Sequence, residues 1–259
     1  YTHVLSYGFI DRNTEHNTKL KLGTCYYYLN DMDEAEKNIS SVLDYIKKDT
    51  EPLIMLSAIY IKKKDFDKAL KILRKAESFP GNDPVVLFQT GSIYYYKNDL
   101  KYVTYFDRLF DVIKNSTNDL KNYFKAVKIL LIHHYEKNNY SRVIDISDSI
   151  NKIYNDSDII LISAKSYYFL RKYEKAIEFF GKVPLDSSSR IMLASSYART
   201  EKKDKAVEQI KFFIDNQSLK QEAMKDSTLK VYIEEIEAAR AEELKKKQNT
   251  TNSGNFQKQ

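Results

Sequence analysis

The sequence of 259 residues is poor in the residues that build disulfides, metal clusters and phosphate loops: it has one cysteine, six glycines, four prolines and no tryptophan. The single thiol, Cys25, excludes an internal disulfide framework and a metal site made of several cysteines. The glycines are scattered, so no phosphate-cradling loop is present. No run of 18 or more apolar residues occurs, and we therefore expect no membrane-spanning helix.

Charged residues are abundant but mixed along the chain. The 42 basic and 36 acidic residues give a net charge of +6, and only Lys245–Lys247 form a basic run. A nucleic-acid-binding protein usually gathers like charge on one face, so this mixture argues against nucleic acid as the partner. The adjacent His133 and His134 would point about 100° apart on a helix and could not chelate one metal ion. We expect no metal, no cofactor, no small-molecule substrate and no catalytic residues, and hence not an enzyme.

A pattern repeated six times is the most informative feature that the chain does contain. An alanine or valine recurs at intervals of 34, 34, 40, 33 and 30 residues, and an aromatic side chain lies nine residues before each. The alanines and valines are Ala35, Ala69, Val103, Val143, Ala176 and Ala206. The aromatic residues are Tyr26, Tyr60, Tyr94, His134, Tyr167 and Tyr197. A period in this range predicts a stacked array of structural repeats.

Each repeat has the sequence signature of two helices joined by a polar turn. Apolar residues recur at helical spacing, as at Leu53, Leu56 and Ile59, and strand-like alternation is rare. The predicted turns are 30–31, 63–65, 97–99, 137–139, 171–172 and 201–202. Gly23 and Gly91 lie three residues before the aromatic position. Because glycine weakens a helix, we expect another backbone to approach closely there.

The third and fourth repeats depart from the pattern. Asp107 and Ser147 replace an expected large apolar residue, and six extra residues occur near 115–120. We expect a longer helix or a bend at this insertion.

Two segments carry the full motif: LGTCYYYLNDMDEAEKNI at 22–39 and LSAIYIKKKDFDKALKIL at 56–73. These segments resemble the tetratricopeptide repeat. The resemblance implies an all-α fold, a right-handed superhelical solenoid of about six helix-turn-helix units over residues 16–217. We further expect 1–15 to be an arm or the remnant of a preceding repeat. Residues 218–247 should form a C-terminal capping helix, and 248–259 a disordered tail.

In this family the first helices line a concave groove, and 21 tyrosines make such a groove unusually aromatic here. A rotation of 100° per residue turns the positions that follow the packing tyrosine toward the open side. The candidate groove residues are Tyr27, Tyr28, Phe88, Tyr95, Tyr96, Lys128, Tyr135, Lys165 and Tyr168. The alternative is a compositional bias toward tyrosine at half-exposed helix positions.

The family's lysine and asparagine clamp for a terminal carboxylate needs asparagine two residues before the packing aromatic. That position holds Thr24, Ala58, Ser92, Ile132, Lys165 and Ser195. The clamp is therefore absent, and an apolar groove favours a helix or an extended segment of another protein.

The pattern therefore predicts a non-enzymatic scaffold or adaptor that binds another protein within a multiprotein assembly. Two alternatives remain: an RNA-binding repeat protein of pentatricopeptide type, and a self-associating structural component. Because the chain begins at Tyr1, it is expected to be a fragment or a processed product. Its location stays open between the cytoplasm and, if a signal or anchor was removed, an envelope assembly in the periplasm or at a membrane.

Overall fold

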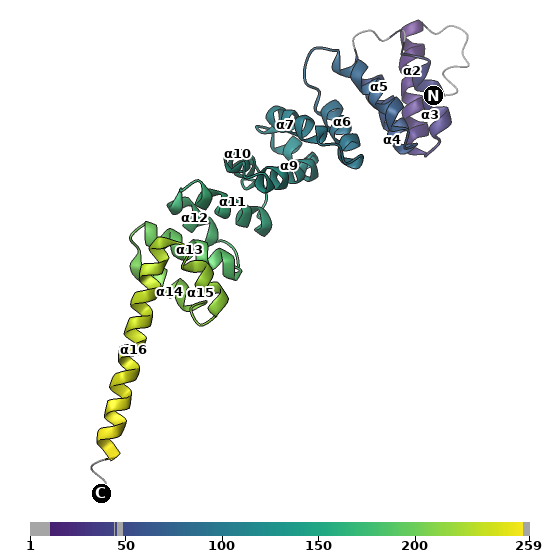
Figure 1. Cartoon of the computed structure of the whole chain (residues 1–259). Helices are drawn as coiled ribbons and strands as arrows, with labels where there is room; N and C mark the ends of the chain where they lie inside the picture. Colours follow the sequence, from purple (N-terminus) through teal and green to yellow (C-terminus); the bar gives the residue numbers. More distant parts are fainter. Residues whose placement is uncertain (1–10, 44, 46–48, 256–259) are drawn as a thin grey trace. The chain divides into compact units, whose positions relative to one another are not determined.

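The structure is a computed structural model that describes residues 11–43, 45 and 49–255, with side chains described as far as residue 247. All regular secondary structure in this part of the chain is helical, and no strand occurs in it (Figure 1). The all-α expectation is confirmed. No helix among the described residues is both long enough and apolar enough to cross a bilayer.

The chain divides into two compact units, which meet within one helix between Leu130 and Leu131. Unit 1 contains α2 (Arg12–Tyr28), α3 (Met32–Ser40), α4 (Glu51–Lys62), α5 (Phe66–Glu77), α6 (Pro84–Tyr96), α7 (Lys101–Ile113), α8 (Thr117–Asn122) and the start of α9 (Phe124–Glu136). Unit 2 contains the rest of α9 and α10 (Tyr140–Ile150), α11 (Ser157–Phe169), α12 (Tyr173–Phe180), α13 (Ser187–Arg199), α14 (Lys203–Lys211), α15 (Gln217–Ala223) and α16 (Ser227–Asn255).

Each helix pair is joined by the same turn, in which one residue adopts a left-handed conformation. These residues have φ between 53° and 64°: Asn30, Lys64, Asn98, Asn138, Arg171 and Glu201. In the second repeat the Lys64 amide donates to the Ile61 carbonyl (3.0 Å) and the Asp65 amide to the Tyr60 carbonyl (2.9 Å), the two bonds of a Schellman motif. Asp65 then caps α5, because its carboxylate accepts the Lys68 amide at 3.2 Å.

This turn explains the nine-residue spacing of the motif. The aromatic residue is the third from the end of the first helix, and its carbonyl closes the turn. Five of the six alanine or valine positions are the fourth residue of the second helix and are fully buried: Ala35, Ala69, Val143, Ala176 and Ala206. In the third repeat α7 begins one residue later, at Lys101, and Val103 is only half-buried. The ring of Phe106 fills the helix interface there instead.

Gly23 and Gly91 lie inside helices at places where no side chain fits. A Cβ on Gly23 would come within 2.5 Å of Ile39 Cγ1 and 3.2 Å of the Ala35 carbonyl oxygen. A Cβ on Gly91 would lie 2.5 Å from the Phe106 ring. The expected close approach is present at both positions, but at Gly91 the neighbour is an aromatic ring and not backbone.

The six extra residues form a separate short helix, α8, where we expected a longer helix or a bend. Ser116 caps α8 by accepting the Asp119 amide at 3.3 Å, and Leu120 buries its side chain. In the fourth repeat Ile146, beside Ser147, provides the large buried apolar side chain.

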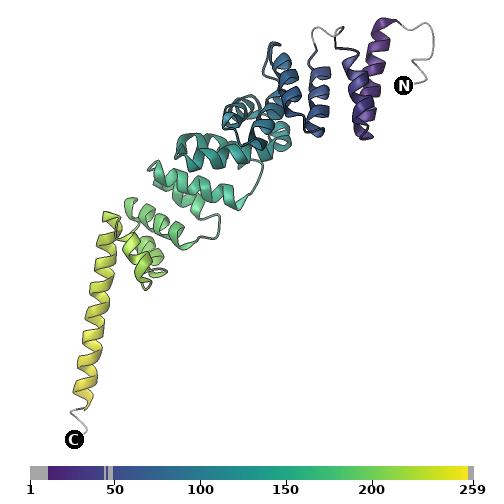
Figure 2. The same cartoon turned by 45° about the vertical axis from the view of Figure 1, so that its right-hand side comes forward.

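The C-terminal region is divided differently from our expectation of one capping helix. The short helix α15 precedes α16, and Leu229 and Ile233 of α16 join the core of α13 and α14. Helix α16 extends beyond the helix pairs of its own unit (Figure 2) and continues through Asn255, where we expected a disordered tail from residue 248. Residues 1–10 and 256–259, parts of the predicted arm and tail, lie outside the described residues.

Gly91→Ala is expected to lower the free energy of unfolding by about 1–3 kcal/mol, because the added methyl group overpacks the interface with Phe106. Gly181 is the matched control: it has helical φ (−69°), and a Cβ there would lie at an ordinary distance, 3.4 Å from the Ile177 carbonyl oxygen. Gly181→Ala should be stabilising by about 0.4–1 kcal/mol. Urea unfolding followed by circular dichroism measures both, and equal midpoints for the two variants would contradict this packing.

Candidate protein-interaction surface

The first helices of successive repeats lie against each other and form one layer in each unit. In unit 1, α2 contacts α4 and α4 contacts α6; in unit 2, α11 contacts α13. The second helices pack behind this layer, each against its own first helix and the first helix of the next repeat, as for α5 and α6. We call the open side of this layer the first-helix face of each unit.

Three of the predicted groove residues are strongly exposed on the first helices of unit 1. Tyr28, Tyr95 and Tyr96 expose 79%, 46% and 65% of their surface, and Tyr27 and Phe88 are half-buried. Large rings exposed in this way make these residues candidates for a contact surface.

Neighbouring side chains hold the less exposed rings in place. The Lys62 ammonium lies 4.3 Å from the centre of the Tyr27 ring. The Phe88 ring lies 5.2 Å from the Tyr123 ring, which follows α8. These groups are therefore ordered before any partner binds, which lowers the entropy cost of binding.

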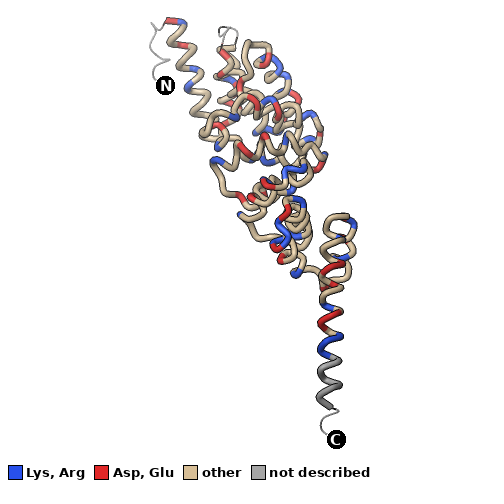
Figure 3. The backbone as a smooth tube through the Cα atoms, turned by 90° about the vertical axis from the view of Figure 1, so that its left-hand side faces the viewer, with Lys and Arg blue, Asp and Glu red and all other residues tan. Residues whose placement is uncertain are grey.

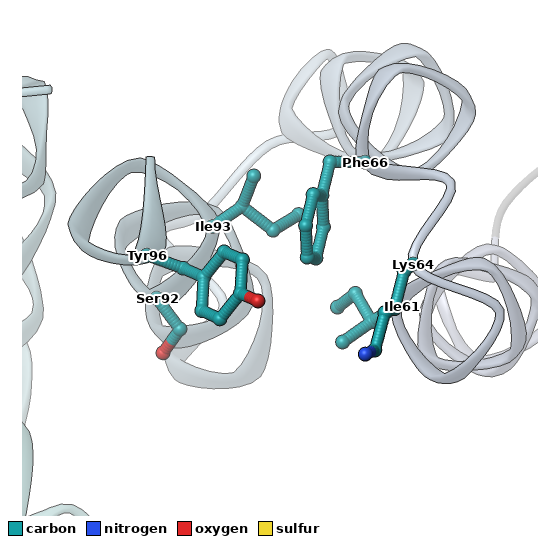
Figure 4. Close-up of a pocket in the computed structure, with 6 residues that line it drawn as sticks. All are labelled: Ile61, Lys64, Phe66, Ser92, Ile93 and Tyr96. Carbon is teal, nitrogen blue, oxygen red and sulfur yellow. The ribbon is translucent and has the colours of Figure 1, made fainter. Parts of the chain in front are cut away.

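An apolar pocket of about 280 Å³ opens between the second and third repeats of unit 1. Its walls are Ile61 of α4, Lys64 of the turn, Phe66 of α5, and Ser92, Ile93 and Tyr96 of α6. Figure 4 shows Ile61 and Lys64 on one side of this pocket, across from the residues of α6. Sequence reasoning placed Tyr96 in a groove but did not predict the pocket.

The same contact between repeats occurs in both units. The ring at the start of one second helix packs against the last residue of the next first helix: Phe66 lies 5.0 Å from Tyr96, and Tyr140 lies 4.6 Å from Phe169. In the following repeat the Arg199 guanidinium lies 5.5 Å over the Tyr173 ring. The sequence signal for this contact is the apolar residue six positions after the packing aromatic.

The remaining candidate groove residues lie in both units, and they differ in burial and in their partners. Lys128 is half-buried in the part of α9 that belongs to unit 1. In unit 2, Tyr135 is half-buried, and burial raises its pKa. The Lys165 ammonium lies 3.7 Å from the Asp186 carboxylate, and the Tyr168 hydroxyl donates to Ser195 at 3.3 Å. Lys165 and Tyr168 therefore already have partners within unit 2.

A half-buried polar cluster, which we did not predict, joins α13 to the start of α16. Asp226 accepts hydrogen bonds from the Ser195 hydroxyl (2.6 Å), the Arg199 guanidinium (2.9 Å) and the Thr228 amide (2.9 Å). Burial opposes the charge on Asp226, but the bonds from Ser195, Thr228 and Arg199 outweigh it and lower the pKa of this carboxyl. The cluster holds the C-terminal helices on the last repeat.

The six packing aromatics differ in burial, and Tyr26, Tyr60 and Tyr197 are half-buried. Tyr94, His134 and Tyr167 are buried. The Tyr60 hydroxyl donates to Glu36 at 2.8 Å, and burial together with this bond raises the pKa of Tyr60 to about 12. Within the described residues, no three His, Cys, Asp or Glu side chains are grouped to hold a metal ion.

A tandem series of helix pairs with one recurrent turn defines a helical-repeat protein. Residues 50–82, the second pair, match the family model of the tetratricopeptide repeat. Taken with the helix pairs on either side, this match supports a tetratricopeptide-repeat protein.

Curated relatives match only a short part of the chain. BBSome complex member BBS4 of Bos taurus and of Mus musculus are each 36% identical over 73 residues, which is 28% of this chain and 14% of each relative.

Solved structures agree over more of the chain. The structure of Naa15/Naa10 bound to HypK-THB aligns with a TM-score of 0.56 at 11% identity, over 91% of this chain and 35% of that chain. A tetratricopeptide repeat protein from Parabacteroides merdae aligns with a TM-score of 0.49 at 14% identity, over 85% and 89%. At 11% identity, the likeness to the Naa15/Naa10 structure concerns the fold alone.

Asp226→Asn is expected to cost about 1–3 kcal/mol of unfolding free energy at pH 7, because the charge-assisted bonds from Arg199 and Ser195 are weakened. The folded pKa of Asp226 lies below its unfolded value, so the stabilisation is complete above about pH 4 and is lost as pH falls through the folded pKa. Urea unfolding from pH 7 to pH 2 should show the variant and the parent converging in acid. The exposed Asp204 is the control, and a pH-independent gap at Asp226 would contradict the assignment.

Proposed function

We propose that the chain is a non-enzymatic scaffold that binds a segment of another protein on its first-helix face. The observation that carries this proposal is the exposure of Tyr28, Tyr95 and Tyr96 at the ends of first helices in unit 1. Tyrosine combines a large rigid ring with a polar hydroxyl, and it is enriched where binding energy concentrates in protein interfaces.

The chemistry of the face selects an apolar or amphipathic partner segment. The position that would hold the asparagine of a carboxylate clamp is Ala58 in α4 and Ser92 in α6. Neither side chain can grip a terminal carboxylate as an asparagine amide does. A helix or an extended strand with apolar side chains is the better match for rings and aliphatic residues.

Charge also favours a protein partner over nucleic acid. Basic and acidic residues alternate along both units (Figure 3), and many basic residues are engaged in ion pairs, such as Lys63 with Asp33 and Glu36 at 2.6 Å. Charge that is mixed in this way does not favour a phosphate backbone as the partner, which supports our preference for protein over RNA.

The names of the matched relatives support a role within a multiprotein assembly. The BBS4 proteins are named as members of a complex, and their matched segment covers 28% of this chain. We infer that this chain also serves within a multiprotein assembly.

Replacing both Tyr28 and Tyr95 by alanine should weaken partner binding by about tenfold or more, because each loses a large exposed ring. The partner would be captured by crosslinking in the native host, and its affinity measured by titration calorimetry. Thermal stability should change little, whereas Tyr60→Ala, which removes the hydrogen bond to Glu36, should lower the melting temperature.

Unchanged affinity in the Tyr28 and Tyr95 double variant would contradict the proposed surface. RNA binding that falls steeply with salt would favour the pentatricopeptide alternative, and dimers in light scattering would favour self-association.

A further inference from the structure

The pocket between the second and third repeats includes a position at which four of the six repeats carry tyrosine. The residue after the packing aromatic is Tyr27, Tyr95, Tyr135 and Tyr168 in the first, third, fourth and fifth repeats. In the second repeat the same position holds Ile61. The sixth repeat has Ala198 there. Ile61 forms one wall of the pocket, so the space opens where four of the other five repeats carry a tyrosine.

The equivalent site between the fourth and fifth repeats has larger side chains. There the positions of Ile61 and Ser92 are occupied by Tyr135 and Lys165. The rings of Tyr140 and Phe169 stack at 4.6 Å with 14° between their planes. In the second and third repeats the corresponding rings, Phe66 and Tyr96, are tilted by 50°, and the pocket remains open beside them (Figure 4).

The size and lining of the pocket suit one aromatic side chain. An apolar cavity of about 150 Å³ holds a benzene ring, so a space of about 280 Å³ accepts a phenyl, phenol or indole group with part of its backbone. Four of the six lining residues are apolar or aromatic: Ile61, Phe66, Ile93 and Tyr96.

Lys64 adds a positive charge at the edge of this apolar surface. Its backbone is fixed by the left-handed turn, and it makes no ion pair with any described residue. The nearest carboxylates in sequence are already occupied: Asp65 pairs with Lys68 at 3.0 Å, and Asp67 pairs with Lys97 at 3.1 Å. The Lys64 ammonium is therefore available to a carboxylate from outside the chain.

We propose that this pocket binds an aromatic side chain from an extended segment of a partner protein, and that an acidic residue next to it on the segment pairs with Lys64. The partner thereby supplies the ring that is missing from the tyrosine series at Ile61. This inference rests on the proposed function and specifies the chemistry of the segment.

The chain has no tryptophan, so a peptide that contains one can be followed by its own fluorescence. The probe is the acetylated, amidated peptide Gly-Trp-Asp-Asp-Gly, titrated with the full chain. Unlabelled Gly-Phe-Asp-Asp-Gly should compete with it, and Gly-Ala-Asp-Asp-Gly should not. Absence of binding at millimolar concentrations would overturn the proposal.

Ile61→Tyr is the decisive variant, because it places in the pocket the ring found at the same position in four other repeats. We expect it to weaken peptide binding by about tenfold or more and to leave the melting temperature close to that of the parent. Ile61→Leu keeps the side-chain volume and should bind as the parent does. Binding by Ile61→Tyr equal to the parent would overturn the proposal.

Lys64→Glu tests the charge and leaves the apolar wall residues Ile61, Phe66 and Ile93 unchanged. Glu201 shows that glutamate is accepted at this turn position. The variant should prefer Gly-Trp-Lys-Lys-Gly over the acidic probe by about threefold to tenfold, and added salt should remove the preference. An unchanged preference for the acidic peptide would overturn the role of Lys64. If the captured partner binds Ile61→Tyr as well as it binds the parent but loses affinity for the Tyr28 and Tyr95 double variant, the pocket assignment fails while the scaffold function stands.

Discussion

The left-handed turn inside each helix pair is the constraint on which the rest of the structure depends. A non-glycine residue in this conformation costs about 1–2 kcal/mol, and three of the six positions hold Lys64, Arg171 and Glu201, which are not favoured there. The turn persists because it closes the first helix with two backbone bonds and starts the second helix at a fixed residue. That fixed start sets the alanine of the second helix at the interface of the pair, and the pairs then stack into layers whose open side carries the exposed rings.

Much of the fold follows from the sequence because its determinants are local. The spacing of nine residues, the polar turn and the helical periodicity all act within about 20 residues, and these features are confirmed in every repeat. The structure differs from the predictions where a side chain starts a helix at a residue other than the expected one. The Asp99 carboxylate accepts a hydrogen bond from the Lys101 amide, so α7 starts one residue late. Phe106 then fills the helix interface where Val103 was expected. Likewise, Asp226 starts α16 and divides the predicted capping helix.

Only part of the candidate surface could be predicted from the sequence. A rotation of 100° per residue predicted the exposure of Tyr28, Tyr95 and Tyr96, because exposure at a helix end depends on few neighbours. The pocket and the Asp226 cluster could not be predicted in this way. Each joins side chains about 30 residues apart in sequence, and their contacts depend on how one repeat packs on the next. Tyr168 shows the same limit, since its hydroxyl is bound to Ser195 of the following repeat.

The most direct test of this account is the unfolding free energy of Ala176→Leu, measured by urea denaturation. Ala176 is fully buried in the core of unit 2 that also contains Tyr167 and Phe180, so three added carbons should cost about 1–3 kcal/mol or more. The exposed Ala238 in α16 is the control, and leucine there should change stability by less than about 0.5 kcal/mol. If Ala176→Leu unfolds at the same urea concentration as the parent, small residues at the helix crossing do not determine the stacking, and the account is wrong.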